Sequence, residues 1–211
     1  MYRRPIDLVR LFADLFQDLP PLTKALYGPG MAVLVSYPVL SVLLGPGQGG
    51  QAFVTAFMFG FALQTAFGFE ALVRRLLTRF SAVAAVCVAL TLVCLPLTVL
   101  VLATDPLWCQ RLQSAVFIVS GGVFLVDMVK GRVATAASLW PDAEMQSHLP
   151  NLTRVMVLFH ATFLVLNETL IQATDLSQWL VFWAVLPIVS NMVLRALVRT
   201  VINIDNRGEP V

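Results

Sequence analysis

The sequence is poor in charged residues. Only 12% of its 211 residues are Asp, Glu, Lys or Arg, whereas 58% are hydrophobic. A soluble domain carries about 25% charged residues, which cover its apolar core in water. This shortage excludes a soluble domain and a disordered chain, and it predicts an integral membrane protein. The net charge of +2 is also too small to indicate a nucleic-acid binder.

Residue patterns that support catalysis are scarce as well. The three cysteines have no metal-ligand spacing, and the two histidines form no His-x-x-x-His pair. The chain has neither a Gly-rich phosphate loop nor a Gly-x-Ser-x-Gly elbow. We therefore expect no enzymatic activity, no metal and no cofactor.

What the sequence does contain is a series of long apolar runs. A helix needs about 20 apolar residues to cross about 30 Å of hydrocarbon. The runs predict an all-α domain over residues 27–202 with six transmembrane helices, at about 31–45, 52–72, 80–103, 110–130, 154–172 and 178–199. The first run is bracketed by Gly28-Pro29-Gly30 and Gly45-Pro46-Gly47, so a re-entrant or broken helix is the alternative there.

The positions of the basic residues predict the orientation. Thirteen of the fourteen Lys and Arg residues fall in alternate segments: the N-terminus, the connections 70–79 and 127–154, and the C-terminal end. Only Arg111 falls in the other set. Because basic residues gather on the cytoplasmic side of membrane helices, both termini are expected to be cytoplasmic.

The two ends of the chain are expected to lie outside the bilayer core. Residues 1–26 place apolar side chains at three- and four-residue spacing with charges between them, a pattern typical of an amphipathic interfacial helix. The alternative is a helix packed on the protein's own cytoplasmic loops. Residues 203–211 are expected to form a cytoplasmic tail.

The second half of the chain resembles a known family. It reads Leu-Thr-Arg-Val-Met-Val-Leu-Phe-His from Leu152, reaches Asn167, and continues to Trp179-Leu-Val-Phe182. The segments 104–108 and 130–132 fit the same pattern. In these positions the chain is similar to the intracellular septation protein A family, as a divergent member with Thr153, Met156 and His160 at altered positions. The resemblance implies a polytopic protein of the bacterial inner (cytoplasmic) membrane that acts in septation, cell division, elongation or envelope maintenance.

Polar side chains inside the predicted spans are the candidate functional residues. A charged group there costs about 2.5–3.5 kcal/mol on insertion scales, so each needs a partner or a purpose. The candidates for an intramembrane polar network are Gln64, Asp127, His160, Asn167, Glu168, Asn191 and Arg195.

Two relations among these residues follow from helical spacing. His160 and Asn167 are seven positions apart and share one helix face, where they would form either a proton or substrate path or interhelical hydrogen bonds. Asp127 and Arg195 are expected at the same depth, so we predict an ion pair between them. The alternatives are pairing of Asp127 with Lys130 and extension of Arg195 to lipid headgroups.

Three functions remain open from the sequence. The first is a non-enzymatic scaffold that works through membrane-protein partners of the envelope or division machinery. The second is a small transporter or lipid-handling protein with a polar intramembrane cavity. The third is an accessory subunit of a larger membrane complex. All three place the protein in the lipid bilayer.

Overall fold

The structure is a computed structural model that describes residues 24–77, 81–102 and 105–208, and its described elements are all helical. In chain order they are α2 (Lys24–Leu44), α3 (Gly49–Leu77), α4 (Ala82–Leu102), α5 (Pro106–Val129), α6 (Ala134–Leu139), the 3-10 helix η1 (Ala143–His148), α7 (Leu149–Ala173) and α8 (Leu176–Gly208).

The prediction of a multi-pass helical membrane protein is confirmed. Among the described residues, five stretches are long and apolar enough to cross a membrane: Ala25–Leu44, Gly49–Glu70, Pro106–Val129, Ala143–Ala173 and Leu176–Asp205. In α4 the described apolar stretch, Ala82–Thr91, is shorter than these five.

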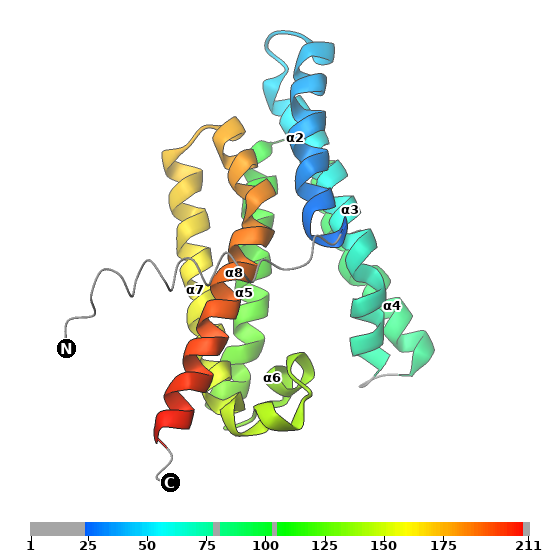
Figure 1. Cartoon of the computed structure of the whole chain (residues 1–211). Coiled ribbons are helices and arrows are strands. Elements are labelled where there is room, and N and C mark those ends of the chain that lie inside the picture. Colours follow the sequence, from blue (N-terminus) through cyan, green and yellow to red (C-terminus); the bar gives the residue numbers. More distant parts are fainter. Residues whose placement is uncertain (1–23, 78–80, 103–104, 209–211) are drawn as a thin grey trace, which may run out of the picture.

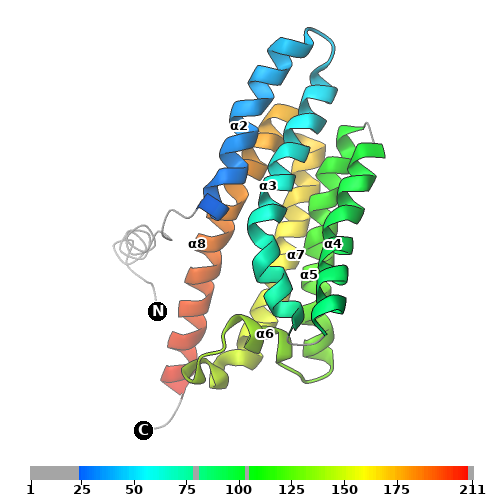
Figure 2. The same cartoon turned by 90° about the vertical axis from the view of Figure 1, so that its right-hand side faces the viewer.

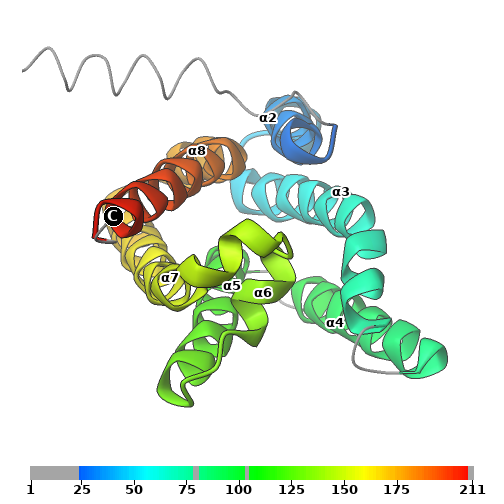
Figure 3. The same ribbon diagram turned by 60° about the horizontal axis from the view of Figure 1, so that its bottom comes forward.

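The long helices run roughly side by side, with their connections at two opposite ends (Figures 1 and 2). The turns between α2 and α3 and between α7 and α8 lie at one end, whereas α6 and the end of α8 lie at the other. Helix α5 packs most extensively on α7, and α2 packs on α3 and α8. Seen from the second end, α6 lies across the bundle (Figure 3).

The first span differs from its expected form. Helix α2 is continuous from Lys24 to Leu44 and contains Pro29 and Pro38, so Gly28-Pro29-Gly30 lies inside the helix instead of bracketing it. No re-entrant break occurs over these residues. The second Gly-Pro-Gly element does form a turn, with φ of +86° at Gly45 and +91° at Gly47.

Close contacts between helices explain why glycines occur inside α2 and α3. A Cβ on Gly30 would lie 2.3 Å from the carbonyl oxygen of Ala184 in α8. A Cβ on Gly60 would lie 2.2 Å from Val33 Cγ2 in α2. Absence of a side chain at both positions lets the helix backbones approach closely.

Local signals set the ends of α5 and α8. Asp105 Oδ1 accepts a hydrogen bond from the Leu107 backbone N–H, and Pro106 follows the cap. Gly131, with φ of +62°, ends α5.

At the start of α8, Asp175 and Gln178 cap each other's backbone N–H groups. Helix α8 then continues to Gly208, into the segment expected as a tail.

The expected interfacial helix falls almost wholly on residues 1–23, which lie outside the described residues, as do residues 209–211 of the expected tail. The expected connection 70–79 is described to Leu77. It contains the ion pair between Glu70 and Arg74 at the exposed end of α3.

Two apolar clusters hold the bundle together. One joins α5, α6, α7 and α8 around Leu152, Met156 and Phe163. The other joins α2, α3 and α8, where the rings of Phe57 and Trp183 lie 5.0 Å apart between centroids. Members of both clusters, among them Phe117 and Trp183, line a pocket that also has polar side chains.

Candidate functional site

A cavity of about 450 Å³ lies inside the bundle, between α3, α5, α6, α7 and α8. Its position follows from uneven packing, because α7 packs extensively on α5 and only sparsely on α8. Six polar and nine apolar side chains line it: Gln64, Gln113, Ser120, His160, Ser190, Asn191, Phe117, Phe124, Leu139, Met156, Phe159, Trp183, Leu186, Pro187 and Leu194. Its mixed lining is typical of a site for a small, partly apolar molecule.

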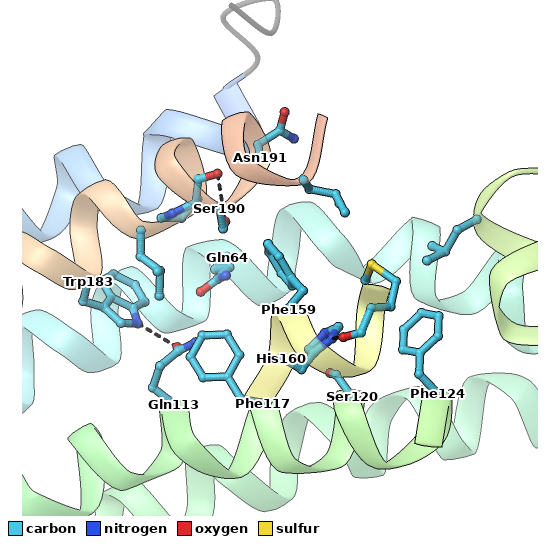
Figure 4. A pocket seen from close by; sticks show the side chains of 15 residues that line it. Gln64, Gln113, Phe117, Ser120, Phe124, Phe159, His160, Trp183, Ser190 and Asn191 are labelled. Atoms are coloured by element: carbon cyan, nitrogen blue, oxygen red, sulfur yellow. Dashed lines mark hydrogen bonds between the residues drawn. The ribbon is translucent and has the colours of Figure 1, made fainter. Parts of the chain in front are cut away.

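His160 lies at the cavity wall, near the middle of α7 (Figure 4). Its Nδ1 lies 2.7 Å from the Met156 carbonyl oxygen. Because a carbonyl can only accept, Nδ1 carries the proton, and Nε2 is the nitrogen left for another partner. The ring stacks on Phe124 with centroids 5.6 Å apart. Aromatic surface thus holds the imidazole in one orientation.

The α5–α7 contact fixes the position of His160. A Cβ on Gly121 would lie 2.9 Å from His160 Cβ, so the glycine allows the two helices to touch beside the cavity. On the opposite side, Trp183 Nε1 donates to Gln113 Oε1 at 3.1 Å and joins α8 to α5 (Figure 4). The cavity is therefore framed by specific helix contacts.

Among the polar residues that line the cavity, Asn191 has a side-chain oxygen without a hydrogen bond in the described part of the chain. Its Oδ1 atom is buried and has no hydrogen-bond partner among the described residues. A buried acceptor without a partner costs about 1–3 kcal/mol.

Asn191 also borders a second pocket, of about 290 Å³, on the side toward the C-terminus of α8. This pocket is lined by Trp140, Asn191, Leu194, Arg195, Val198 and Arg199. The two pockets share Asn191 and Leu194. No carboxylate lines either pocket within the part of the chain that the structure describes.

Asn167 and Glu168 do not line the cavity. Asn167 is fully buried near the α7–α8 turn, where its Nδ2 donates to Ser114 Oγ at 2.8 Å and to the Gln110 carbonyl at 3.2 Å. Its Oδ1 accepts from Trp179 Nε1 at 3.1 Å. One amide thereby joins three helices.

Glu168 continues this cluster toward the surface. Its Oε1 accepts from Ser114 Oγ at 2.6 Å, and its Oε2 lies 3.7 Å from a guanidinium nitrogen of Arg111. We call Asn167, Ser114, Trp179, Glu168 and Arg111 the closed cluster, because its members bind one another. His160 and Asn167 both face α5, but they belong to different sites.

The remaining predicted residues lie toward the α6 end. Asp127 Oδ2 accepts from the Thr135 backbone N–H at 2.7 Å, which anchors the start of α6 to the end of α5. Arg195 lines the second pocket. Both residues have further interactions, and their pairing with each other stays a prediction.

Sequence reasoning missed the polar face of α5. Gln110, Gln113 and Ser114 are spaced three and four residues apart within an apolar run, and this spacing places them on one helix face. The spacing was a usable signal. The amide of Asn167 on α7 needed partners, and Gln110 and Ser114 of α5 supply two of them.

A second group that the sequence did not reveal is a hydrogen-bonded set of His148, Asn151 and Asp205 at the α6 end, which we call the polar lock. His148 Nδ1 lies 2.8 Å from Asp205 Oδ2, and Asn151 Nδ2 donates to Asp205 Oδ1 at 2.9 Å. The lock ties the last turns of α8 to the start of α7. Asp205 is more than fifty positions from both His148 and Asn151, so no local pattern indicates the group.

Among the described residues, no group of three His, Cys, Asp or Glu side chains is placed to hold a metal ion. No protein-family model, no curated protein and no solved structure matches the chain.

Proposed function

We propose that the protein binds a small, largely apolar molecule in its central cavity and acts as a lipid-handling or transport protein of the bacterial inner membrane. The cavity carries this proposal. Its volume of about 450 Å³ lies within the range of about 300–1,000 Å³ usual for ligand sites. Nine of its fifteen lining residues are apolar, which suits a hydrocarbon chain.

The proposal includes six spans with both termini in the cytoplasm. Helix α4 is the sixth span, and its alternation with α3 and α5 agrees with the two sets of connections (Figure 2). The end with α6 and the C-terminus carries Lys130, Arg132 and Arg154 and is the cytoplasmic end. The closed cluster then lies near the periplasmic face.

A second candidate function is a non-enzymatic scaffold for septation, elongation or envelope maintenance, alone or as an accessory subunit. The resemblance of residues 152–182 to the septation family favours it. However, Leu152, Phe159, Asn167 and Trp179 are all buried. A resemblance carried by core residues supports a shared packing more directly than a shared partner surface.

A photoactivatable, uncharged C16 alcohol tests the cavity in protein purified in mild detergent. We expect it to label Met156 and Phe159, as mapped by mass spectrometry. Ser120→Leu and Ser190→Leu each place bulk in the cavity and should reduce this labelling severalfold. Val119→Leu is the matched control, because Val119 is 66% exposed and adjoins Ser120. Equal labelling in all four proteins would refute the proposal.

A further inference from the structure

The second pocket has the composition of an anion site. Arg195 and Arg199 line it, one helical turn apart on the same face of α8 as Asn191. Half-buried Trp140 from the end of α6 supplies an aromatic wall. Two guanidinium groups with no carboxylate in the described lining favour a phosphate or carboxylate over a cation.

The arginines also have other interactions within the chain. Each guanidinium has five N–H donors in a planar fork, so one partner does not exhaust its binding capacity. Recognition of an anion therefore does not require that either arginine be otherwise unoccupied.

The two pockets adjoin. Asn191 and Leu194 line both, so the anion pocket is next to the mainly apolar central cavity. Asn191, whose Oδ1 is buried and has no partner within the described chain, is therefore at the junction of the two pockets. Along α8, the two arginines, then Asn191, then the mainly apolar cavity follow one another. This order matches one elongated molecule with a charged head, a polar linkage and an apolar tail.

We propose that the ligand is a single-chain anionic amphiphile, with its phosphate or carboxylate between Arg195 and Arg199 and its hydrocarbon chain in the cavity beside His160. The inference rests on the proposed function, which places the hydrocarbon chain in the cavity, and it adds the chemical class of the ligand's head group. With the cytoplasmic end at α6, the ligand is drawn from the inner leaflet, where a basic pocket near the headgroups binds anionic lipid.

Competition against the photoactivatable alcohol tests the head. We expect hexadecyl phosphate to displace the probe about 25-fold more potently than hexadecanol, since each of the two basic residues near the headgroups contributes about fivefold. In the double variant Arg195→Gln, Arg199→Gln this preference should disappear, while hexadecanol should compete as in the native protein.

The matched control is Arg132→Gln, Arg154→Gln, which removes two positive charges at the same end but outside the pocket. It should keep the phosphate preference. Loss of the preference there would indicate general attraction of anions to the basic end and would overturn the inference.

Two further arms separate the sources of binding. Inorganic phosphate at equal concentration should not compete, and Ser120→Leu should weaken hexadecyl phosphate severalfold. Competition by inorganic phosphate, or unchanged binding in Ser120→Leu, would mean that the head binds without the tail and would overturn the inference. Specific alcohol labelling without phosphate preference would remove the inference alone, whereas absence of cavity labelling would remove the proposed function too.

Discussion

Two asparagines on neighbouring helices show how differently one side chain can be used within one bundle. Asn167 is fully buried, and both ends of its amide are hydrogen-bonded to α5 or α8. Asn191 has a buried Oδ1 with no partner among the described residues. The closed cluster uses its polar groups to join helices, whereas Asn191, beside the cavity, keeps a polar atom without a partner among the described residues.

Removing the two amides in turn should give the largest difference. Asn167→Ala leaves the buried Trp179 Nε1 without an acceptor and removes the donor to Ser114 Oγ, so it should lower the free energy of unfolding by about 2 kcal/mol. Asn191→Ala removes a buried acceptor that has no partner among the described residues, so it should not lower the free energy of unfolding. Unfolding by SDS in mixed micelles, followed by tryptophan fluorescence, measures both. Equal losses would contradict the division into two regions.

Two adjacent glycines test the cavity wall next. Gly121→Ala places a Cβ 2.9 Å from His160 Cβ and should cost about 1–2 kcal/mol by forcing α5 from α7. Gly122→Ala meets nothing within 4 Å and should stabilise α5 by up to about 1 kcal/mol. The same unfolding assay reads both variants. Similar effects would mean that the α5–α7 contact does not constrain the cavity.

The sequence predicted the helices better than their contacts. Apolar length identifies a membrane helix, and this signal is local, so the long helices and most of their ends could be predicted directly. The first span was predicted from residue 31, whereas α2 begins at Lys24, because Gly28-Pro29-Gly30 has the local appearance of a break. The close approach of Gly30 to Ala184 is a tertiary contact that no local pattern contains.

The same limit applies to the polar residues. Their cost in hydrocarbon marks them as important, but it does not say which will pair. His160 and Asn167 share a helix face, yet opposite Asn167 stands Ser114, which can bond to it, and opposite His160 stands Gly121, which cannot. The residues of the facing helix decide between a closed cluster and a cavity.

The ion pair of Arg111 and Glu168, at the edge of the closed cluster, should contribute less to the free energy of unfolding than Asn167 at its centre. Arg111 and Glu168 lie 3.7 Å apart, with side chains 56% and 32% exposed, so solvent screens their attraction. Glu168→Gln keeps an acceptor for Ser114 and should cost less than about 1 kcal/mol. Glu70→Gln, in a pair 76% exposed on both sides, is the control and should have no measurable effect. A loss as large as that of Asn167→Ala would place the centre of the cluster at the ion pair.

The smallest effect on stability is expected from the helix cap at the start of α8, which precedes Trp179 of the closed cluster. The Gln178 backbone N–H and then the Ser177 hydroxyl bond to the Asp175 carboxylate and hold its pKa below the usual value. A carboxyl group whose pKa is lower in the folded state stabilises the fold above its unfolded pKa, and this contribution is lost as pH falls through the folded pKa. Asp175→Asn keeps a capping side chain without the titration. The unfolding midpoint of the native protein should therefore fall relative to that of Asp175→Asn as the solution is acidified, and a constant difference would show that capping by Asp175 does not depend on its charge.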